Sequence, residues 1–572
     1  MRIGNCSGFY GDRLGAMREM LDGGELDVLT GDYLAELTML LLWRIRSKDP
    51  DRGYAATFIR QLEDCLGDAW ERGVKIVANA GGLNPGGCAA AVREIANRLG
   101  IRVNVAYLEG DDLLPRQAEL VRAGLKLPES TITANAYLGG WGIATALSGG
   151  AQVVITGRVT DAALVIGPAA WWHGWARNDY DALAGALVTG HVLECGAQAT
   201  GGNYSFFNEV PGIEHIGFPL AEIASDGTSV ITKHADTGGL VDIGTVTAQL
   251  LYEIGAPHYL NPDVTADFST IELTQDGPDR VRVSGVKGIV PPDTTKVCVN
   301  TLGGFRNSMT FLLTGLDIDA KADLVRRQLA PALENVESVE WHLARTDHDD
   351  ADTNEGAVAR LTVAVKDSDA KKIGRPFSSA AVEIALASYP GATMTAPPGE
   401  AAPYGVYQAA YIPNARVEHR VVTQNDERIE IHAEAGAPSP PSSPSTSTST
   451  GAAPDAGATW LMPLGAIAGA RSGDKGGNAN VGVWVRTDRA YEWLSAFLDV
   501  EMLKRLLPET AGLKVDRYDL PNLRALNFVV EGLLGEGVAS STRQDPQAKG
   551  LGEWLRSRQV EVPTALLENE NE

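Results

Sequence analysis

The chain has 572 residues, of which 44% are hydrophobic and 21% are charged, a composition typical of globular proteins with more than one core. Its 49 Lys and Arg residues against 73 Asp and Glu residues give a net charge of −24, which argues against nucleic acid or an anionic membrane surface as the main partner. Phosphate binding needs clustered basic side chains. At about 150 residues per domain, the length predicts three or four domains.

The first 260 residues alternate short apolar segments with amphipathic helices. A helix with apolar residues at 3–4 spacing follows Tyr54 and ends before Gly73. Strands of the buried type are predicted at 75–79, 102–106 and 152–156. This β-α-β alternation predicts an α/β domain over residues 1–260, with a Rossmann-like, mainly parallel sheet covered by helices on both faces.

The pattern changes near residue 261, where a hairpin around Asp276 is followed by strands and helices in alternation. Residues 261–433 are therefore predicted to form an α+β domain. Residues 438–450 are only Pro, Ser and Thr, so we expect a disordered linker over 434–457, because such a composition cannot bury apolar surface. The strand and helix pattern of residues 458–572 predicts a small ferredoxin-like α+β domain.

Cysteine use and the N-terminus indicate a reducing compartment. The five cysteines are an odd number and none lies at CxxC or metal-knuckle spacing, so we expect no disulfide framework. Residues 1–7 lack the charged and apolar segments of a signal peptide, and we expect a cytoplasmic protein. The nine histidines are never at ligand spacing and HExxH is absent, so no metal site is predicted.

A glycine-rich loop follows the strand at 75–79 and opens a helix. Backbone N–H groups in such a loop can approach a phosphate or carboxylate, which the helix N-terminus also favours. The predicted ligand-binding residues are Asn79, Gly81, Gly82, Asn84, Gly86 and Gly87. The loop is neither a GxGxxG nor a Walker A motif, which argues against NAD or ATP, and the alternative is a tight turn without a ligand.

Two charged residues follow the strand at 152–156. Arg158 could bind a carboxylate or phosphate in bidentate fashion, and Asp161 could act as a base or orient the arginine. The alternative is that Asp161 caps the next helix and pairs with Arg158 for structural reasons alone.

Glu194 is a second acid–base candidate, three residues after His191 and followed by a glycine-rich stretch. The backbone of Gly201, Gly202 and Asn203 could supply oxyanion donors. Cys195 could be a nucleophile, but nothing nearby in sequence activates it, and a lone cysteine is more often a small buried apolar residue.

Two further charged segments are candidates. Lys233 and Asp236, at a strand end, could stabilise an enolate, although capping by Asp236 and solvation of Lys233 is the alternative. Beyond the linker, a charged and glycine-rich loop before a strand could bind an anion or close over the main site; its candidate residues are Arg471, Asp474, Lys475 and Asn478. The alternative there is a surface hairpin connection.

Several of these segments together resemble a known family. The motifs at 4–12, 79–87, 156–161 and 194–202 resemble the acyclic terpene utilisation AtuA family, and the motif at 470–480 resembles its companion ferredoxin-fold domain. The resemblance implies a role in the breakdown of acyclic terpenoids and related branched acyl-CoA compounds. Biotin-dependent carboxylases are associated with the same breakdown.

We therefore expect a catabolic enzyme that acts on a branched or terpenoid-derived acyl-CoA or carboxylate. The expected chemistry is proton transfer of the hydratase or lyase type, without a cofactor, in which Arg158 holds the anion and Asp161 or Glu194 moves the proton. A homo-oligomer without nucleic-acid or membrane partners is expected. The alternative is a non-catalytic accessory or scaffold protein associated with an acyl-CoA carboxylase.

Overall fold

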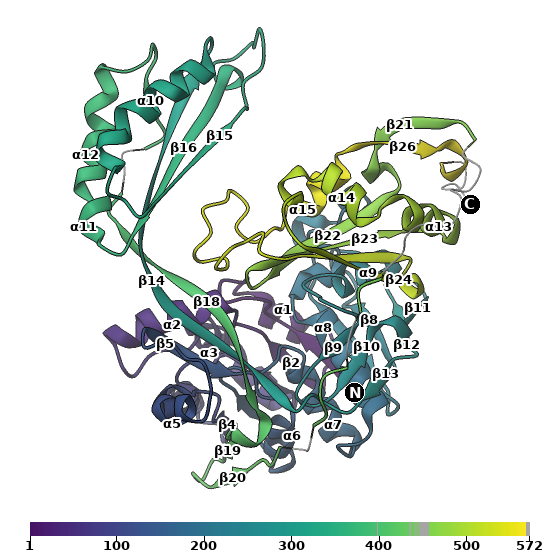
Figure 1. The fold of residues 1–572 in the computed structure, drawn as a ribbon. Helices are drawn as coiled ribbons and strands as arrows, with labels where there is room; N and C mark the ends of the chain where they lie inside the picture. Colours follow the sequence, from purple (N-terminus) through teal and green to yellow (C-terminus); the bar gives the residue numbers. More distant parts are fainter. Residues whose placement is uncertain (397–398, 434–435, 441–442, 446–456, 568–572) are drawn as a thin grey trace. The chain divides into compact units, whose positions relative to one another are not determined.

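The structure, a computed structural model, describes residues 1–396, 399–433, 436–440, 443–445 and 457–567. The chain divides into two units (Figure 1). Unit 1 comprises Met1–Asn300, Tyr407–Val538 and Asp545–Glu572, and unit 2 comprises Thr301–Val406 and Ala539–Gln544. Among the described residues, no helix is long and apolar enough to cross a membrane.

Unit 1 is built on an eleven-stranded sheet. Its order is β11 (Glu272–Gln275), β12 (Val281–Ser284), β8 (Ser229–Lys233), β7 (Pro219–Ile223), β1 (Arg2–Asn5), β2 (Val28–Gly31), β3 (Lys75–Ala78), β6 (Val153–Ile155), β4 (Val105–Glu109), β19 (Arg420–Val422) and β20 (Arg428–Glu430). Neighbouring strands from β1 to β4 pair in parallel, and the other pairs of the sheet are antiparallel.

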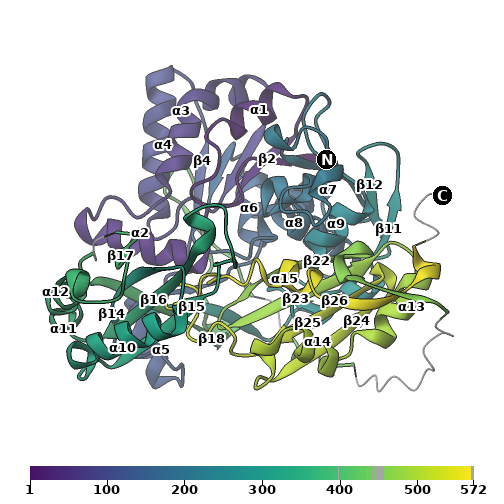
Figure 2. The ribbon, with the colours of Figure 1, turned by 90° about the horizontal axis from the view of Figure 1, so that it is seen from above.

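Helices cover both faces of the parallel strands. Core residues of α1 (Ala16–Asp22), α3 (Ala56–Glu71) and α4 (Pro85–Leu99) pack with Ile76 and Ala78, whereas those of α6 (Trp141–Ser148), α7 (Ala163–His173) and α8 (Tyr180–Leu193) pack with Val77. Successive side chains of a strand point to opposite faces, so these are two separate cores. Figure 2 shows α3 and α4 on one side of β2 and β4, and α6 and α8 on the other.

The predicted α/β class is therefore correct, but the arrangement differs from the Rossmann order. In that order parallel strands are added on both sides of β1, whereas here β1 has a parallel neighbour on one side only, and β6 lies between β3 and β4. The hairpin at 272–284 and the strands at 420–430, predicted to belong to a second domain, extend this same sheet.

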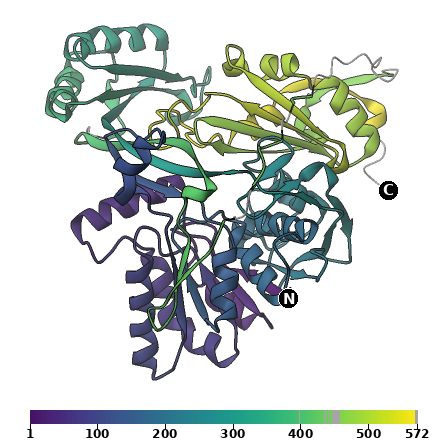
Figure 3. The ribbon, with the colours of Figure 1, turned by 60° about the horizontal axis from the view of Figure 1, so that its bottom comes forward.

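Unit 2 has its own sheet and core. The sheet contains β15 (Ser338–Ala344), β16 (Val358–Asp367), β14 (Thr294–Thr314) and β17 (Thr393–Met394), and β18 (Ala402–Pro413) also pairs with β14. Core residues of α10 (Ile318–Leu333) and α12 (Arg375–Glu383) pack on it, and α11 (Ala370–Ile373) precedes α12 (Figure 3).

β14 is one long strand that continues through Gly303 and Gly304. A Cβ at Gly303 would clash with the Tyr404 ring of β18, so this glycine allows a close approach within the sheet.

The C-terminal part of unit 1 forms a four-stranded antiparallel sheet in the order β22 (Ala468–Lys475), β23 (Asn478–Val485), β25 (Ala525–Val530) and β24 (Val515–Leu520). The helices α13 (Asp488–Phe497) and α14 (Val500–Leu506) connect β23 to β24, and α15 (Leu551–Arg556) follows β25. The predicted loop at 471–478 is wrong: these residues form two paired strands joined by a turn at Gly476 and Gly477.

Shorter elements complete unit 1. They are α2 (Glu36–Lys48), α5 (Gln117–Arg122), β5 (Thr131–Ala136), α9 (Ile243–Leu250), the small sheet of β9 (His258–Leu260), β10 (Thr265–Asp267) and β13 (Lys287–Ile289), and the pair β21 (Thr459–Pro463) and β26 (Gln559–Pro563). The predicted linker at 434–457 lies mostly outside the described residues. Within it, Ala437 bridges Pro292, and the Ser445 N–H donates to the Arg517 carbonyl at 2.8 Å.

Candidate functional site

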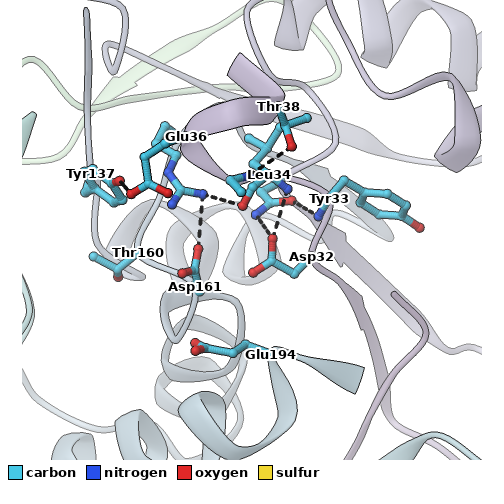
Figure 4. Close-up of polar contacts among 12 residues, drawn as sticks. Asp32, Tyr33, Leu34, Glu36, Thr38, Tyr137, Thr160, Asp161 and Glu194 are labelled. Atoms are coloured by element: carbon cyan, nitrogen blue, oxygen red, sulfur yellow. Dashed lines mark hydrogen bonds and ion pairs between the residues drawn. The ribbon is translucent and has the colours of Figure 1, made fainter. Parts of the chain in front are cut away.

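The helices that follow the parallel strands switch from one face of the sheet to the other between β3 and β6. The helix that follows β3 is α4, on one face, and the helix that follows the neighbouring β6 is α7, on the other. Open α/β sheets bind ligands in the crevice outside the carboxyl ends of two such strands. The residues that follow β2, β3 and β6 meet there, and Figure 4 shows their polar contacts.

Asn79 connects the loops after β2 and β3. Its Nδ2 donates to Asp32 Oδ1 at 2.6 Å, and its Oδ1 accepts from the Tyr33 N–H at 2.7 Å. Asn79 is fully buried, so its predicted role as a ligand-binding residue is replaced by a structural one. Burial and the charge of Asp161 raise the pKa of Asp32 well above its ordinary value, although Arg158 acts in the opposite direction.

The glycine-rich loop after Asn79 packs tightly, and most of its N–H groups already have partners. Within it, N–H groups of Gly81, Gly82, Asn84 and Gly87 all donate inside the protein, and the Asn84 side chain caps α4. A Cβ at Gly81 would lie 2.6 Å from the Thr156 carbonyl, whereas one at Gly86 would only touch the Tyr107 ring. The alternative of a tight turn therefore describes this loop better than anion binding.

The buried Arg158 forms an ion pair with the half-buried Asp161. Nη1 of Arg158 lies 3.2 Å from Oδ1 of Asp161 and donates to the Leu34 carbonyl at 2.8 Å. The guanidinium lies over the Tyr137 ring, 4.4 Å from its centroid. The N-cap of α7 is Ala162, so Asp161 does not cap the helix, while its side chain keeps 31% of its surface exposed. Asp161 is thus available to a ligand and oriented by Arg158.

A second group of charges lies beside the same tyrosine and was missed from the sequence. The Tyr137 hydroxyl donates to Glu36 Oε1 at 2.7 Å, and the Lys296 ammonium lies 3.9 Å from that oxygen. Burial acts to raise the pKa of Glu36, but Lys296 and Arg158 outweigh it and lower the pKa to about 2. Glu36 is therefore a carboxylate at neutral pH.

The environment of Glu194 shifts its pKa in the direction opposite to that of Glu36. It lies at the C-terminal end of α8, where its Oε1 is 3.0 Å from Nδ1 of His191, and both side chains are less than a tenth exposed. Burial, followed by the charges of Asp161 and Glu253, raises the pKa of Glu194 well above its ordinary value. Burial and the charge of Lys475 lower the pKa of His191 to about 4. Both groups are thus held in their neutral forms.

The C-terminal sheet brings two of its four predicted residues to this cluster. The Lys475 ammonium donates to the Glu253 carbonyl at 2.6 Å and lies 5.6 Å from the centroid of the Tyr259 ring. Burial and the charges of Glu253 and Glu36 raise the pKa of Asp474 to about 8. Arg471 instead lies over Tyr252 and bonds Gln198, and Asn478 accepts the Gly532 N–H at 2.9 Å.

The structure separates other predicted residues from the cluster. Lys233, at the end of β8, pairs with Asp279 at 3.3 Å, and Asp236 is exposed in a left-handed turn. Four strands lie between β8 and β6, which corresponds to about 24 Å at the usual strand spacing. The N–H groups of Gly201 and Gly202 donate to carbonyls of their own turn, and Asn203 is exposed.

Two polar atoms of the cluster have no partner. Among the described residues, the buried atoms with neither a hydrogen bond nor an ion pair include Arg158 Nε and Glu194 Oε2. Buried polar groups are normally satisfied, so unpartnered atoms that meet at a switch point indicate a place for a polar ligand.

Burial raises the pKa of the Cys195 thiol well above its ordinary value, which argues against Cys195 as a nucleophile.

A cavity adjoins the cluster at Tyr137. Its wall is partly apolar, with Trp141, Val417 and Ile431, and partly polar, with Arg177 and His419. Tyr137 thus contributes to both places: Arg158 lies over its ring in the charged site, and it also lines the cavity with its polar and apolar walls.

In the described part of the chain, no group of three or more His, Cys, Asp and Glu side chains is arranged to hold a metal ion.

Comparison with known proteins identifies the family. No curated protein matches the chain. A family model described as acyclic terpene utilisation family protein AtuA matches residues 1–423, and a model of the AtuA ferredoxin-like domain matches residues 462–561. The family description indicates a catabolic role in acyclic terpene utilisation. The chain therefore belongs to the AtuA family and carries the AtuA ferredoxin-like domain at its C-terminus.

Proposed function

We propose that this chain is an enzyme that transfers a proton on a branched or terpenoid-derived carboxylate or acyl-CoA, in a reaction of the hydratase or lyase type. The observation that carries the proposal is Glu194, a buried carboxyl group with one oxygen unpartnered, whose pKa burial raises well above its ordinary value. A carboxylic acid that keeps its proton at neutral pH can act as a general acid.

Two carboxyl groups in different environments support this assignment. Glu36 is ionised because Lys296 and Arg158 stabilise its charge, whereas Glu194 is neutral because it is buried beside Asp161 and Glu253. Environments that separate the pKa values of neighbouring carboxyl groups are typical of acid–base sites. In our proposal Glu194 donates the proton, and Asp161, oriented by Arg158, faces the substrate.

The cations of the cluster favour an anionic substrate. Arg158 favours the charged form of both Glu36 and Glu194, Lys296 favours that of Glu36, and Lys475 favours that of Glu194, in a protein whose net charge is −24. A carboxylate or the phosphates of coenzyme A would be attracted to such a local concentration of positive charge. The cavity beside Tyr137, with its partly apolar wall, offers space for a hydrocarbon branch.

The test is deuterium incorporation into candidate substrates. Branched acyl-CoA thioesters and the matching free acids are incubated with the protein in D₂O, and mass spectrometry follows exchange, water addition or cleavage. Glu194→Gln keeps the shape of the side chain and removes the acid, so the reaction should be lost while thermal-shift binding of the active compound persists. Glu492→Gln, at an exposed position of α13, is the matched control.

Two results would contradict the proposal. One is equal turnover by wild type and Glu194→Gln on a compound that the protein converts. The other is a panel in which no acyl-CoA or carboxylate raises the melting temperature, because a ligand that binds the folded state must stabilise it.

A further inference from the structure

The start of α7 and the end of α8 meet in a close backbone contact. A Cβ at Gly190 of α8 would lie 2.8 Å from the Cα atom of Ala162, the residue directly after Asp161. Glu194 follows Gly190 by four residues, which is about one helical turn. The contact therefore brings the side chain of Glu194 beside Asp161, and Figure 4 shows the carboxyl group of Glu194 below Asp161.

Each of these two carboxyl groups is held by a partner of its own. Oδ1 of Asp161 lies 3.2 Å from Nη1 of Arg158, which is buried and also donates to a backbone carbonyl. Oε1 of Glu194 lies 3.0 Å from Nδ1 of His191. The His191 ring packs against the Tyr259 ring, with 5.3 Å between their centroids. Both carboxyl groups thus have fixed positions before any ligand binds.

The two carboxyl groups do not satisfy each other. In the described part of the chain, Oε2 of Glu194 has no hydrogen-bond partner, although the residue is only 9% exposed. The side chain of Asp161 keeps 31% of its surface exposed, so this side of the pair is open to a small molecule. A buried polar atom without a partner is costly, and a group that fills this place must therefore bring hydrogen-bonding atoms of its own.

A hydroxyl group matches the two partners best. A hydroxyl donates one hydrogen bond and accepts others, so it can donate to Asp161 and accept from a protonated Glu194. Burial favours that protonated form, because it raises the pKa of Glu194 well above its ordinary value. An ammonium group only donates, and the charges of Arg158 and Lys475, which both act on Glu194, would repel it. A hydrocarbon group would leave Oε2 unpaired.

We propose that the substrate carries a hydroxyl group at its reacting carbon and that this hydroxyl lies between Asp161 and Glu194. The inference rests on the proposed function, because it uses the same site and names the substrate class more closely, as a hydroxylated carboxylate or acyl-CoA. It places the hydroxyl within reach of the acid that the proposed function assigns to Glu194.

The first experiment compares ligands that differ only at the hydroxyl. Isothermal titration calorimetry of the full-length protein measures the Kd of 3-hydroxy-3-methylbutanoate, of 3-methylbutanoate, which lacks the hydroxyl, and of the 3-methoxy analogue, which lacks the donor. Each compound is titrated as the free acid and as the CoA thioester. A hydrogen bond to a charged group corresponds to about 10- to 100-fold in affinity, so the hydroxy compound should bind tighter than both analogues by that factor.

The second experiment assigns the preference to the two residues. In Asp161→Ala and Glu194→Met, the ratio between the Kd values of the deoxy and hydroxy compounds should fall toward one. A loss of stability alone weakens both compounds alike and leaves this ratio unchanged. Asp349→Ala and Glu492→Met, at exposed positions, are the matched controls and should keep the wild-type ratio. If a variant does not fold, the wild-type ratio still decides the proposal.

Equal affinities of the hydroxy and deoxy compounds in the wild type would overturn the hydroxyl proposal, as would a panel in which no compound binds. A preference that persists unchanged in both variants would also overturn it. Deuterium incorporation that depends on Glu194, together with equal affinities, removes only this inference and leaves the proposed function. A clear hydroxyl preference without turnover of any compound leaves the hydroxyl site and removes the proposed function.

Discussion

Oε1 of Glu194 lies 3.0 Å from Nδ1 of His191, one turn apart at the end of α8, and burial favours the neutral form of both groups. The second carboxyl oxygen, Oε2, has no hydrogen-bond partner and is free to face a ligand. Four predictions follow from this pair and its neighbours.

The first concerns the pH dependence of stability. The pKa of Glu194 is raised in the folded state, so folding favours its proton, and the free energy of unfolding falls as pH rises from the ordinary Glu value through the raised value. Glu194→Gln lacks this contribution and should lose that part of the pH slope. Thermal unfolding of both proteins over a pH series measures it, and parallel curves would contradict the assignment.

The second concerns the hydrogen bond from Tyr137 to the ionised Glu36. Tyr137→Phe removes one donor to a buried carboxylate and should reduce the free energy of unfolding by roughly 1.5–3 kcal/mol. Urea unfolding at neutral pH measures the loss. Tyr411→Phe, at an exposed tyrosine, is the control and should change little. Equal stabilities of the two variants would show that the bond contributes nothing.

The third concerns Asn79 as a connection between two loops. Asn79→Ala leaves the buried Tyr33 N–H without a partner and removes one of the two donors to Asp32 Oδ1, the other being the Leu34 N–H, which should cost about 1–3 kcal/mol. The exposed Asn97→Ala provides the comparison on α4. A ligand-binding role instead of a structural one would appear as weaker binding at unchanged melting temperature.

The fourth concerns the contact that positions Lys475. A Cβ at Gly473 would lie 2.5 Å from the Tyr252 ring, so Gly473→Ala must displace β22 or the ring, at a cost of about 1–3 kcal/mol. Thermal unfolding measures the loss. Gly512→Ala, where a Cβ meets no atom within 4 Å, should leave the melting temperature unchanged. Equal melting temperatures of the two variants would contradict a tight contact between β22 and the Tyr252 ring.

The sequence predicted those site residues that follow a recognisable strand or helix. Arg158 and Asp161 come after a buried apolar strand, and Glu194 ends an apolar helix, so their positions could be inferred locally. Asp32 carries the same signal after Val28–Gly31, but that short strand was not predicted. Lys296 could not be found this way, because β14 had been assigned to another domain and only tertiary folding places it beside Glu36.

The glycine-rich loops were misinterpreted for a different physical reason. Glycine at Gly81 is required because a Cβ would collide with the Thr156 carbonyl, and at Gly201 because the backbone has φ of 105°. Close backbone packing and ligand approach both demand the absence of a side chain. The sequence alone does not tell whether a glycine serves close backbone packing or ligand approach. The hydrogen-bond partners of the N–H groups in the structure do tell.

The Pro/Ser/Thr segment between β20 and β21 separates Lys475, in the sequence, from the carboxyl groups of the site. The amine is encoded after the Pro/Ser/Thr segment and the carboxyl groups it acts on are encoded before it, so residues 1–433 alone lack one component of the site. If the gene is divided within that segment and both fragments are produced together, activity should depend on the product of the two fragment concentrations. In the intact chain the covalent link gives each fragment an effective concentration toward the other, and comparison with the split protein measures that concentration.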